Sequence, residues 1–509
     1  MRSWPLLGAV PRGVGTVTFR VWAPRATSVA ARVAGRDHEL GPAGEGLFEA
    51  EVETPAGADY VYLLDGEREQ PDPCSRFQPG GIRGPSRVVD TAAFAWRDGD
   101  WPGLSRDGLV IYELHVGTFS EAGTFHGVAE RLPELRELGV TAIELMPIAT
   151  FPGDRNWGYD GVYTSAPHPA YGGPEGFAEL VDAAHREGLG VILDVVYNHI
   201  GPGNERVTEF GPYFTDRHTT FWGDALDYGR RGVREWAIQN AELWIRDYHV
   251  DGLRLDATHS IFDDSEPHVL AELADRVRAV DPRVLVTSEM ETGDLRPISE
   301  WGHDAQWADE LHHVLHVLLT GEREGYYEDY RPSVDDLRRQ LLRTPAERLV
   351  VCSQNHDQVG NRALGDRPKP EELRLRAAAV LLAPQTPLLF MGEEYGERRP
   401  FQFFTDHIDP NIAQATREGR AREFAAFSAF SGQDVPDPQD PQTFARSKLD
   451  PSAGDDELRA FYARLLALRR GLPRAVSVDA NEEARVLWLR RGDVELVLDF
   501  AERSVELRG

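Results

Sequence analysis

Short apolar runs that alternate with helix-like stretches across the middle of the chain constrain its fold most strongly. Eight runs have the length and composition of strands, at residues 109–116, 141–147, 190–196, 250–259, 283–289, 304–309, 349–354 and 387–391. Helical patterns separate several of them, at residues 127–138, 174–187, 233–248, 266–280, 333–342 and 370–382. Such alternation indicates a parallel sheet, and eight units over about 280 residues predict a closed (β/α)8 TIM barrel. The alternative is an open doubly wound sheet, but the chain has neither a GxGxxG turn nor a P-loop.

The segments on either side of the barrel have a different pattern. Residues 1–90 hold short alternating runs divided by Gly, Pro and Asp, which predicts an N-terminal β-sandwich. The expected division is a linker at residues 91–108, the barrel at 109–450 with an excursion at 200–231 after the third strand, and a C-terminal helix with a small β-domain at 451–509. Within this division, residues 431–456 are rich in Pro, Asp and Gly and are expected to form a loop.

Charge and cysteine content narrow the class of function. The formal net charge is −29, which disfavours nucleic acid and anionic membranes as partners and fits a neutral substrate. No apolar run is long enough for a membrane span. Cys74 and Cys352 lie far apart in the sequence and are expected to be free thiols in a reducing compartment, which favours the cytoplasm.

Reactive side chains follow four of the predicted strands. They are Asp194 and His199 after the third strand, Arg254 and Asp256 in the fourth, Glu289 at the end of the fifth, and His356 with Asp357 after the seventh. A single Arg–Asp pair could be purely structural. The carboxyl ends of barrel strands share one rim, however, so we expect this whole set to meet in one site.

The composition of the set indicates acid–base chemistry on a neutral polar substrate. A retaining glycoside hydrolase needs a nucleophilic carboxylate and a carboxylic acid, roughly 5–5.5 Å apart across the scissile bond. Arg254 and Asp256 point to the same side of a strand, so Asp256 is the natural nucleophile and Glu289, one strand over, the natural acid. Asp357 would bind sugar hydroxyls, and His199 and His356 would donate to the same sugar.

Aromatic residues near this rim could form the walls of a sugar-binding cleft. Trp157 and Tyr159 follow the second strand, and Tyr159, between Gly158 and Asp160, is the best candidate for stacking on a sugar. Other rings are expected in loops or at strand ends: Trp222, Trp301, Trp307, Phe403 and Phe404. Packing is the commoner role for each of these rings.

These motifs resemble a known family. The segments Asp194-Val-Val-Tyr-Asn-His199, Gly252-Leu-Arg-Leu-Asp256, Glu289 and Asn355-His-Asp357 are similar to the four signature regions of the α-amylase superfamily of retaining glycoside hydrolases. The resemblance implies that Asp256 is the nucleophile, Glu289 the general acid/base and Asp357 the transition-state stabiliser. It implies a sugar-binding site formed by Arg254, Asp194, His199, His356, Tyr159 and Trp157.

A narrower resemblance concerns the maltooligosyltrehalose trehalohydrolases, one family of that superfamily. It rests on residues 251–259, 354–362, 384–396 and 400–407. It implies cleavage of the α-1,4 bond next to a terminal trehalose unit, and a maltooligosyltrehalose synthase as the pathway partner. The alternatives are a glycogen branching or debranching enzyme and a non-catalytic α-glucan-binding protein.

The chain departs from the family pattern at the acid and the C-terminus. Ser288 precedes Glu289 where a small residue such as Ala is expected, and Glu291 is a rival for the acid, although we expect it to lie beyond the strand. The C-terminal domain is short for the family. Asn198 matches a calcium ligand of many α-amylases, but no further acidic ligand set accompanies it, so we expect neither a required metal nor a cofactor.

Overall fold

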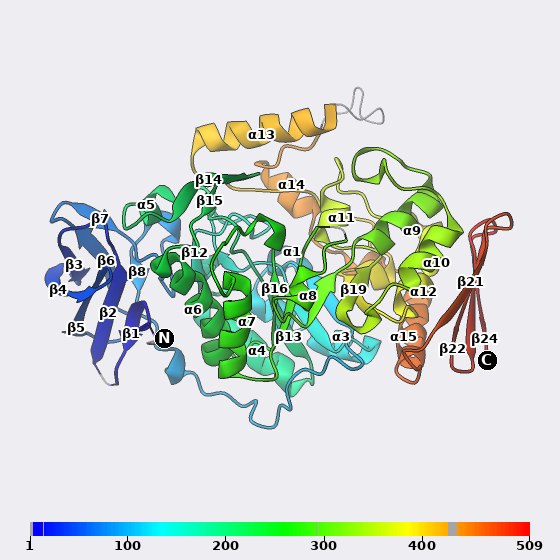
Figure 1. The fold of residues 1–509 in the computed structure, drawn as a ribbon, viewed down its shortest axis with the longest axis horizontal. Helices are drawn as coiled ribbons and strands as arrows, with labels where there is room; N and C mark the ends of the chain where they lie inside the picture. The colour runs from blue at the N-terminus through cyan, green and yellow to red at the C-terminus, as the bar shows by residue number, and fades with distance from the viewer. Residues whose placement is uncertain (1–3, 14, 292, 426–434) are drawn as a thin grey trace.

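The computed structural model describes residues 4–13, 15–291, 293–425 and 435–509, and it places a barrel between two antiparallel sheets. The N-terminal sheet lies on the left of Figure 1 and the C-terminal sheet on the right. No helix among the described residues is long and apolar enough to span a membrane.

The central sheet is a closed parallel barrel, as predicted. Its strands are β9 (Ile111–Leu114), β10 (Ala142–Leu145), β13 (Gly190–Val195), β16 (Gly252–Leu255), β17 (Leu285–Ser288), β18 (Ala305–Trp307), β19 (Leu349–Cys352) and β20 (Thr386–Phe390). All eight predicted runs form strands, and β20 closes the barrel by pairing with β9. Seven of the strands are shorter than predicted, and β20 has the predicted length of five residues. Almost every strand residue is buried, since helices cover the outer face.

Helices surround the barrel: α2 (Phe125–Ala129), α3 (Leu132–Leu138), α4 (Gly173–Arg186), α6 (Arg231–Tyr248), α7 (Val269–Val280), α9 (Glu310–Thr320), α10 (Val334–Leu341), α12 (Pro370–Leu381) and α15 (Asp456–Arg469). The single helix predicted at 127–138 is two helices. Pro133 begins a new helix near the start of α3, because proline is tolerated in a first turn but not in an interior one. Helix α9 was not predicted from the sequence.

The N-terminal strands form an eight-stranded antiparallel sheet that folds over itself. Its strands are β1 (Gly8–Pro11), β2 (Thr16–Trp22), β3 (Val29–Val33), β4 (Arg36–Gly44), β5 (Leu47–Glu53), β6 (Asp59–Leu64), β7 (Arg68–Gln70) and β8 (Ser86–Arg87). Phe19 of β2 contacts Tyr60 of β6 edge-to-face at 4.9 Å although the two strands do not pair, so they lie in facing layers. Trp22 packs against Gly232 of α6, where a Cβ would lie 2.1 Å from the indole.

Rim loops after β10 and β13 contain small hairpins. Strands β11 (Ala149–Thr150) and β12 (Tyr163–Pro167) pair around the segment that carries Tyr159. The excursion predicted at 200–231 contains α5 (Glu205–Thr208) and the hairpin of β14 (Phe214–Thr220) with β15 (Gly223–Leu226).

Beyond β20 the chain crosses the rim and then forms the C-terminal sheet. Helix α13 (Pro410–Ala425), which was not predicted, lies along the top of Figure 1. The prediction of a loop at 431–456 is wrong at residues 441–446, which form helix α14 (Pro441–Arg446). The helix forms there because the Asp440 side chain accepts a hydrogen bond from Gln442 N and caps it. Residues 431–434 lie outside the described part of the chain.

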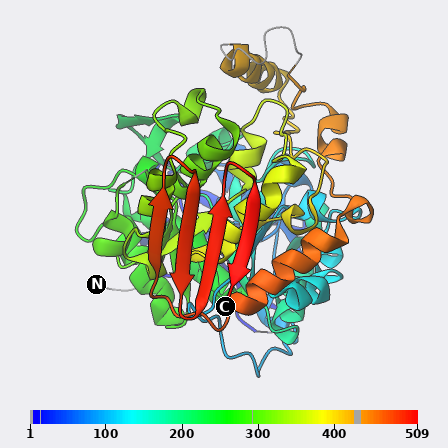
Figure 2. The same ribbon diagram turned by 90° about the vertical axis from the view of Figure 1, so that its right-hand side faces the viewer.

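The small β-domain predicted at the C-terminus is a four-stranded antiparallel sheet. Its strands are β21 (Ser477–Asn481), β22 (Val486–Arg491), β23 (Val494–Asp499) and β24 (Ser504–Arg508). They pack against α10 and α12, as Figure 2 shows from the side of this sheet.

Candidate active site

Arg254 connects three carboxylates at the rim of the barrel. The residue is fully buried on β16. Its Nη1 donates to Asp194 Oδ2 at 2.7 Å and to Asp256 Oδ1 at 2.8 Å, and its Nη2 donates to Glu289 Oε2 at 2.6 Å. The strand register explains this arrangement, since Asp194 of β13 lies directly beside Arg254. The guanidinium also lies over the Trp307 ring, with Cζ 4.2 Å from the centroid, which fixes its plane.

Two donors hold the Asp256 carboxylate. Arg254 binds one oxygen, and Asn198 Nδ2 donates to the other, Oδ2, at 2.6 Å. Asp256 is 6% exposed, so its carboxylate is oriented in a largely dry site. The next residue, Ala257, has a φ of +40°, a left-handed conformation that is rare outside glycine and that occurs at functional sites. This turn lets Ala257 N donate to Glu289 Oε2 at 3.0 Å.

The structure brings Glu289, rather than its rival, to Asp256. Glu289 follows β17, and its side chain, 21% exposed, contacts Arg254. Glu291 is exposed beyond the end of the strand, as expected from its position in the sequence. Asp256 and Glu289 therefore both contact Arg254 from neighbouring strands, so the two carboxyl groups lie on the same side of the barrel rim.

His356 is held between a buried glutamate and a tyrosine. Glu113 of β9 accepts from His356 N at 2.9 Å and contacts Nδ1 at 2.5 Å, while Tyr159 Oη lies 2.8 Å from Nε2. Burial disfavours the charged imidazole, but Asp357 and Glu113 outweigh burial and raise the pKa of His356 to about 10. The ring is therefore a cation at neutral pH.

Asp194 completes this network. Its Oδ2 accepts from Tyr159 Oη at 2.6 Å as well as from Arg254. Burial and the charge of Asp256 raise the pKa of Asp194 to about 7, although Arg254 opposes the shift. Its second oxygen, Oδ1, is buried with no hydrogen-bond partner among the described residues.

Asp357 and His199 come from different motifs and have different surroundings. Asp357 is partly exposed, and its Oδ1 accepts from Asn361 Nδ2 at 3.0 Å. His199 is 5% exposed, and burial lowers its pKa to about 4, so it is neutral. Its ring stacks on Trp222 of the β14–β15 loop, with the ring centroids 4.4 Å apart and an interplanar angle of 1°. This stacking joins the hairpin to the site.

Trp157 packs behind the site. Its indole stacks on Phe401 with the ring centroids 5.2 Å apart, and it meets His356 edge-to-face with the centroids 5.8 Å apart. Its Nε1 donates a hydrogen bond to Gln402 O at 3.0 Å. At 4% exposed it supports His356 through packing, and its role in binding substrate remains a prediction. Tyr159 stacks on His356 at 5.0 Å and is more exposed.

A tight turn determines where Tyr159 lies. Asn156 Oδ1 accepts from Gly158 N at 2.8 Å, and its Nδ2 donates to Asp160 Oδ2 at 2.6 Å. Gly158 has a φ of +110°, and a Cβ there would lie 2.1 Å from Pro147 O. Only glycine fits this close approach.

Several residues of the site were missed in the sequence analysis. Glu113 and Glu144 are buried in strands that we treated as apolar, Asn198 was considered only for calcium, and Asp309 was assigned to the end of a strand without a role. Burial and the charges of Glu289 and Asp357 raise the pKa of Asp309 to about 8. Its place directly after β18 was the available signal, since the other reactive groups also follow strands.

Four acidic residues in loops that follow barrel strands, Asp263, Asp264, Glu393 and Asp406, have mixed surroundings. Asp263 is bound to Arg234 and to Val269 N, and Glu393 is buried against Phe390 N and Tyr462, so both are structural. Asp406 pairs with Arg155 at 2.7 Å. Asp264 is the exposed one, with 87% of its side chain accessible.

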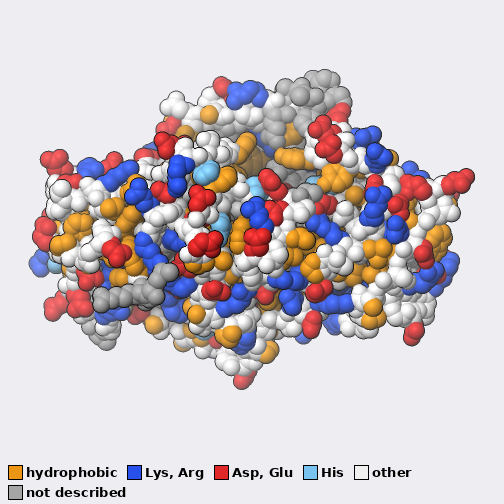
Figure 3. All heavy atoms as spheres, viewed as in Figure 1, with side chains coloured by type: hydrophobic (Ala, Val, Ile, Leu, Met, Phe, Trp, Pro, Cys, Tyr) orange, Lys and Arg blue, Asp and Glu red, His pale blue; other side chains and the backbone are white. Residues whose placement is uncertain are grey.

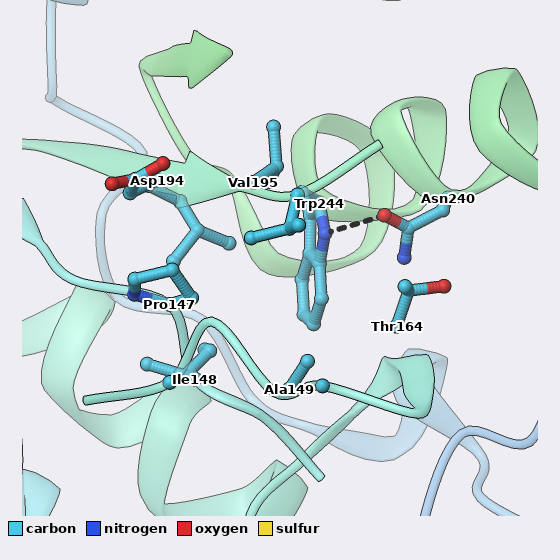
Figure 4. Close-up of a pocket in the computed structure, with 12 residues that line it drawn as sticks. Pro147, Ile148, Ala149, Thr164, Asp194, Val195, Asn240 and Trp244 are labelled. Carbon is cyan, nitrogen blue, oxygen red and sulfur yellow. Dashed lines mark hydrogen bonds between the residues drawn. The ribbon is translucent and has the colours of Figure 1, made fainter. Parts of the chain in front are cut away.

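The molecule has a recess on its surface and a small cavity in its interior, shown in Figures 3 and 4. Figure 3 shows a recess below α13, with hydrophobic and histidine side chains along it. A cavity of about 20 Å³ lies inside, between β13 and α6, where Trp244 donates to Asn240 (Figure 4). It has room for about one water and not for a sugar.

Among the described residues, no group of three or more His, Cys, Asp or Glu side chains could hold a metal ion.

Known proteins are similar to this chain over most of its length. The family model "Alpha amylase, catalytic domain" matches residues 94–222. A protein of Deinococcus radiodurans named malto-oligosyltrehalose trehalohydrolase is 44% identical over 95% of this chain and 87% of its own length. The chain belongs to the malto-oligosyltrehalose trehalohydrolase family. It is therefore a glycoside hydrolase with the α-amylase fold, as the resemblance of its motifs implied.

Other members and a solved structure extend the comparison. A malto-oligosyltrehalose trehalohydrolase of Saccharolobus solfataricus is 42% identical and covers 93% of this chain and 88% of that protein. The crystal structure of a candidate alpha amylase from Salmonella typhimurium is 38% identical with a TM-score of 0.89, covering 96% of this chain and 92% of the other. The similarity thus includes both flanking sheets and not the barrel alone.

Proposed function

We propose that this protein hydrolyses the α-1,4-glucosidic bond next to the terminal trehalose of a maltooligosyltrehalose and releases trehalose, with retention at the anomeric carbon. The observation that carries the proposal is the contact of Arg254 with both Asp256 and Glu289, within a chain whose family is named for this reaction. This contact supports a nucleophile and an acid that act on the same bond.

The first step forms a covalent intermediate. An oxygen of Asp256 attacks the anomeric carbon while Glu289 gives its proton to the leaving oxygen, so trehalose departs as a neutral alcohol. Hydrogen bonds from Arg254 and Asn198 orient the Asp256 carboxylate for this attack. In the second step Glu289 takes a proton from water, the water oxygen attacks the anomeric carbon, and the bond to Asp256 breaks.

The surrounding residues would bind the sugar whose bond is cleaved. The cationic His356 and the buried Asp194 would lie against this sugar and bind its hydroxyls. Tyr159 would stack on the sugar face, and His199 and Asp357 would complete the set. These hydrogen bonds would strengthen as positive charge develops on the sugar ring in the transition state.

The decisive experiment compares two substrates. The purified protein is incubated with maltotriosyl-trehalose and separately with maltopentaose, and the products are separated by chromatography. We expect rapid release of trehalose and maltotriose from the first and little cleavage of the second. Equal or faster cleavage of maltopentaose would contradict the proposal, and new branch points in a linear glucan would indicate the branching alternative.

Further proposals concern the context of the enzyme. We propose a maltooligosyltrehalose synthase as the pathway partner, because this substrate has to be made from a maltooligosaccharide. We propose a cytoplasmic location, supported by the free thiols Cys74 and Cys352. We also propose the division 1–90, 91–108, 109–450 and 451–509, supported by the gap between the end of β8 at Arg87 and the start of β9 at Ile111.

A further inference from the structure

A cavity of about 70 Å³ lies next to the helix that begins at His356. That helix, α11 (His356–Gly360), forms one wall through Gln358 and Val359, while α9 and α12 form others. These three helices lie together on the right of the barrel in Figure 1. The cavity is larger than the about 10–15 Å³ that one water needs and far smaller than the about 300–1,000 Å³ of organic-ligand pockets.

Buried donors without partners line this cavity. Arg376 of α12 is 0% exposed; its Nε and Nη2 bind Glu372 Oε2 at 3.2 and 2.9 Å, and its Nη1 has no hydrogen-bond partner among the described residues. Ser353 is also 0% exposed, and its hydroxyl is likewise unpartnered in the described part of the chain. Buried donors of this kind are costly unless another group accepts from them.

The lining has more positive than negative side chains. Arg362, Arg367, Lys369 and Arg376 line it, against Asp366 and Glu372. Arg362 is paired with Asp366 and with Glu322 at 3.0 Å, and Arg376 is paired with Glu372, but neither Arg367 nor Lys369 forms an ion pair within the described residues. This excess of positive charge stands out in a chain whose net charge is −29.

The guanidinium of Arg367 adds to the same conclusion. Its Nη1 and Nη2 are buried without hydrogen-bond partners in the described ranges, and its Cζ lies 5.0 Å from the Phe390 centroid. Its Nε donates to a backbone carbonyl, Arg399 O, at 3.0 Å, and the acidic charges that act on it, those of Glu397 and Glu393, lie outside the cavity lining. A water could satisfy one N–H of this lining, and an anion would also balance part of the excess positive charge.

We propose that this cavity binds a small inorganic anion, a halide or an oxyanion of the size of chloride or phosphate. The anion would accept hydrogen bonds from Arg376 Nη1 and the Ser353 hydroxyl. Its charge would be balanced by Arg367 and Lys369. Because Gln358 and Val359 form part of the wall, bound anion would stabilise the segment that carries His356 and Asp357 against local opening.

Thermal unfolding in different salts tests the proposal. The midpoint of thermal unfolding is measured by circular dichroism at one pH and one ionic strength. Potassium gluconate sets the ionic strength, and it is replaced stepwise by potassium chloride or potassium phosphate up to 10 mM. We expect a saturable rise of several degrees with at least one of the two anions. A rise with phosphate alone would indicate an oxyanion site, and one with chloride alone a halide site.

Variants distinguish this site from general effects of salt. Arg376→Gln, Arg367→Gln and Ser353→Ala should each reduce the anion-induced rise by at least half. Arg374→Gln should keep it, because Arg374 lies on the same helix but pairs with Glu457 outside the cavity. Should Arg376→Gln fail to fold, the other two variants carry the test. Equal midpoints in all three salts, or an equal rise in all variants, would overturn the proposal.

Discussion

At the scale of single residues, the chemistry depends on how Arg254 orients Asp256 and Glu289. Asp256→Asn removes the nucleophile but keeps an acceptor for Arg254 and leaves the packing unchanged. We expect kcat for trehalose release to fall by about 10⁴-fold or more while KM changes little. The matched control is Glu291→Gln, because Glu291 is exposed and should not matter. A fall of comparable size in the control would mean that the acid has been misassigned.

His356 provides a second prediction at this scale, because its charge depends on Glu113. The raised pKa of His356, about 10, comes from Asp357 and Glu113 acting against burial. Glu113→Gln removes one of these charges, so the pKa of His356 should fall and the neutral ring should appear at lower pH. We expect the His356 imidazole signal, followed by NMR, to titrate at lower pH by one unit or more. An unchanged titration together with reduced activity would indicate a structural role only.

At the scale of elements, the turn at Gly158 positions Tyr159 above His356. Gly158→Ala combines an unfavourable φ of +110° with a Cβ placed 2.1 Å from Pro147 O, so the loop has to move. We expect kcat/KM to fall at least tenfold. Gly57→Ala is the control, since Gly57 lies in the turn between β5 and β6 of the N-terminal sheet and has a φ of +86° with no atom within 4 Å of the added Cβ. Both variants should lose about 1–2 kcal/mol from backbone strain, and only the first should lose activity.

Elements also show where prediction from sequence succeeds and where it fails. The barrel strands were predictable because each is a short apolar run bounded by polar residues that become the rim. Glu113 was not, since its role comes from a contact with His356, which is 243 positions away. The break between α2 and α3 depends on the placement of Pro133, and α14 depends on a cap from Asp440, so local composition alone misreads both.

At the scale of the whole molecule, the segment between the N-terminal sheet and the barrel is anchored to the barrel by a charged cluster. His185 of α4 contacts Asp98 Oδ2 at 3.0 Å and Asp251 Oδ2 at 2.9 Å. Trp101 stacks on the His185 ring at 4.9 Å and donates to Asp251 Oδ1 at 2.6 Å. His249 contacts the same Asp98 oxygen at 2.7 Å. The N-terminal connection is thus joined to α4, to the end of α6 and to the start of β16.

This anchor should make stability depend on pH. Burial opposes the charged form of His185, but Asp251 and Asp98 outweigh burial and raise its pKa above 6.5. A histidine whose pKa is raised in the folded protein stabilises the fold fully at pH values below its unfolded-state pKa. This contribution is lost as the pH rises through the folded-state pKa. His185→Gln should therefore lower the thermal midpoint by several degrees at pH 6 and by clearly less at pH 9. The exposed His126→Gln is the control and should change neither midpoint. A His185→Gln effect that is equal at both pH values would mean that packing against Trp101, and not charge, provides the stabilisation.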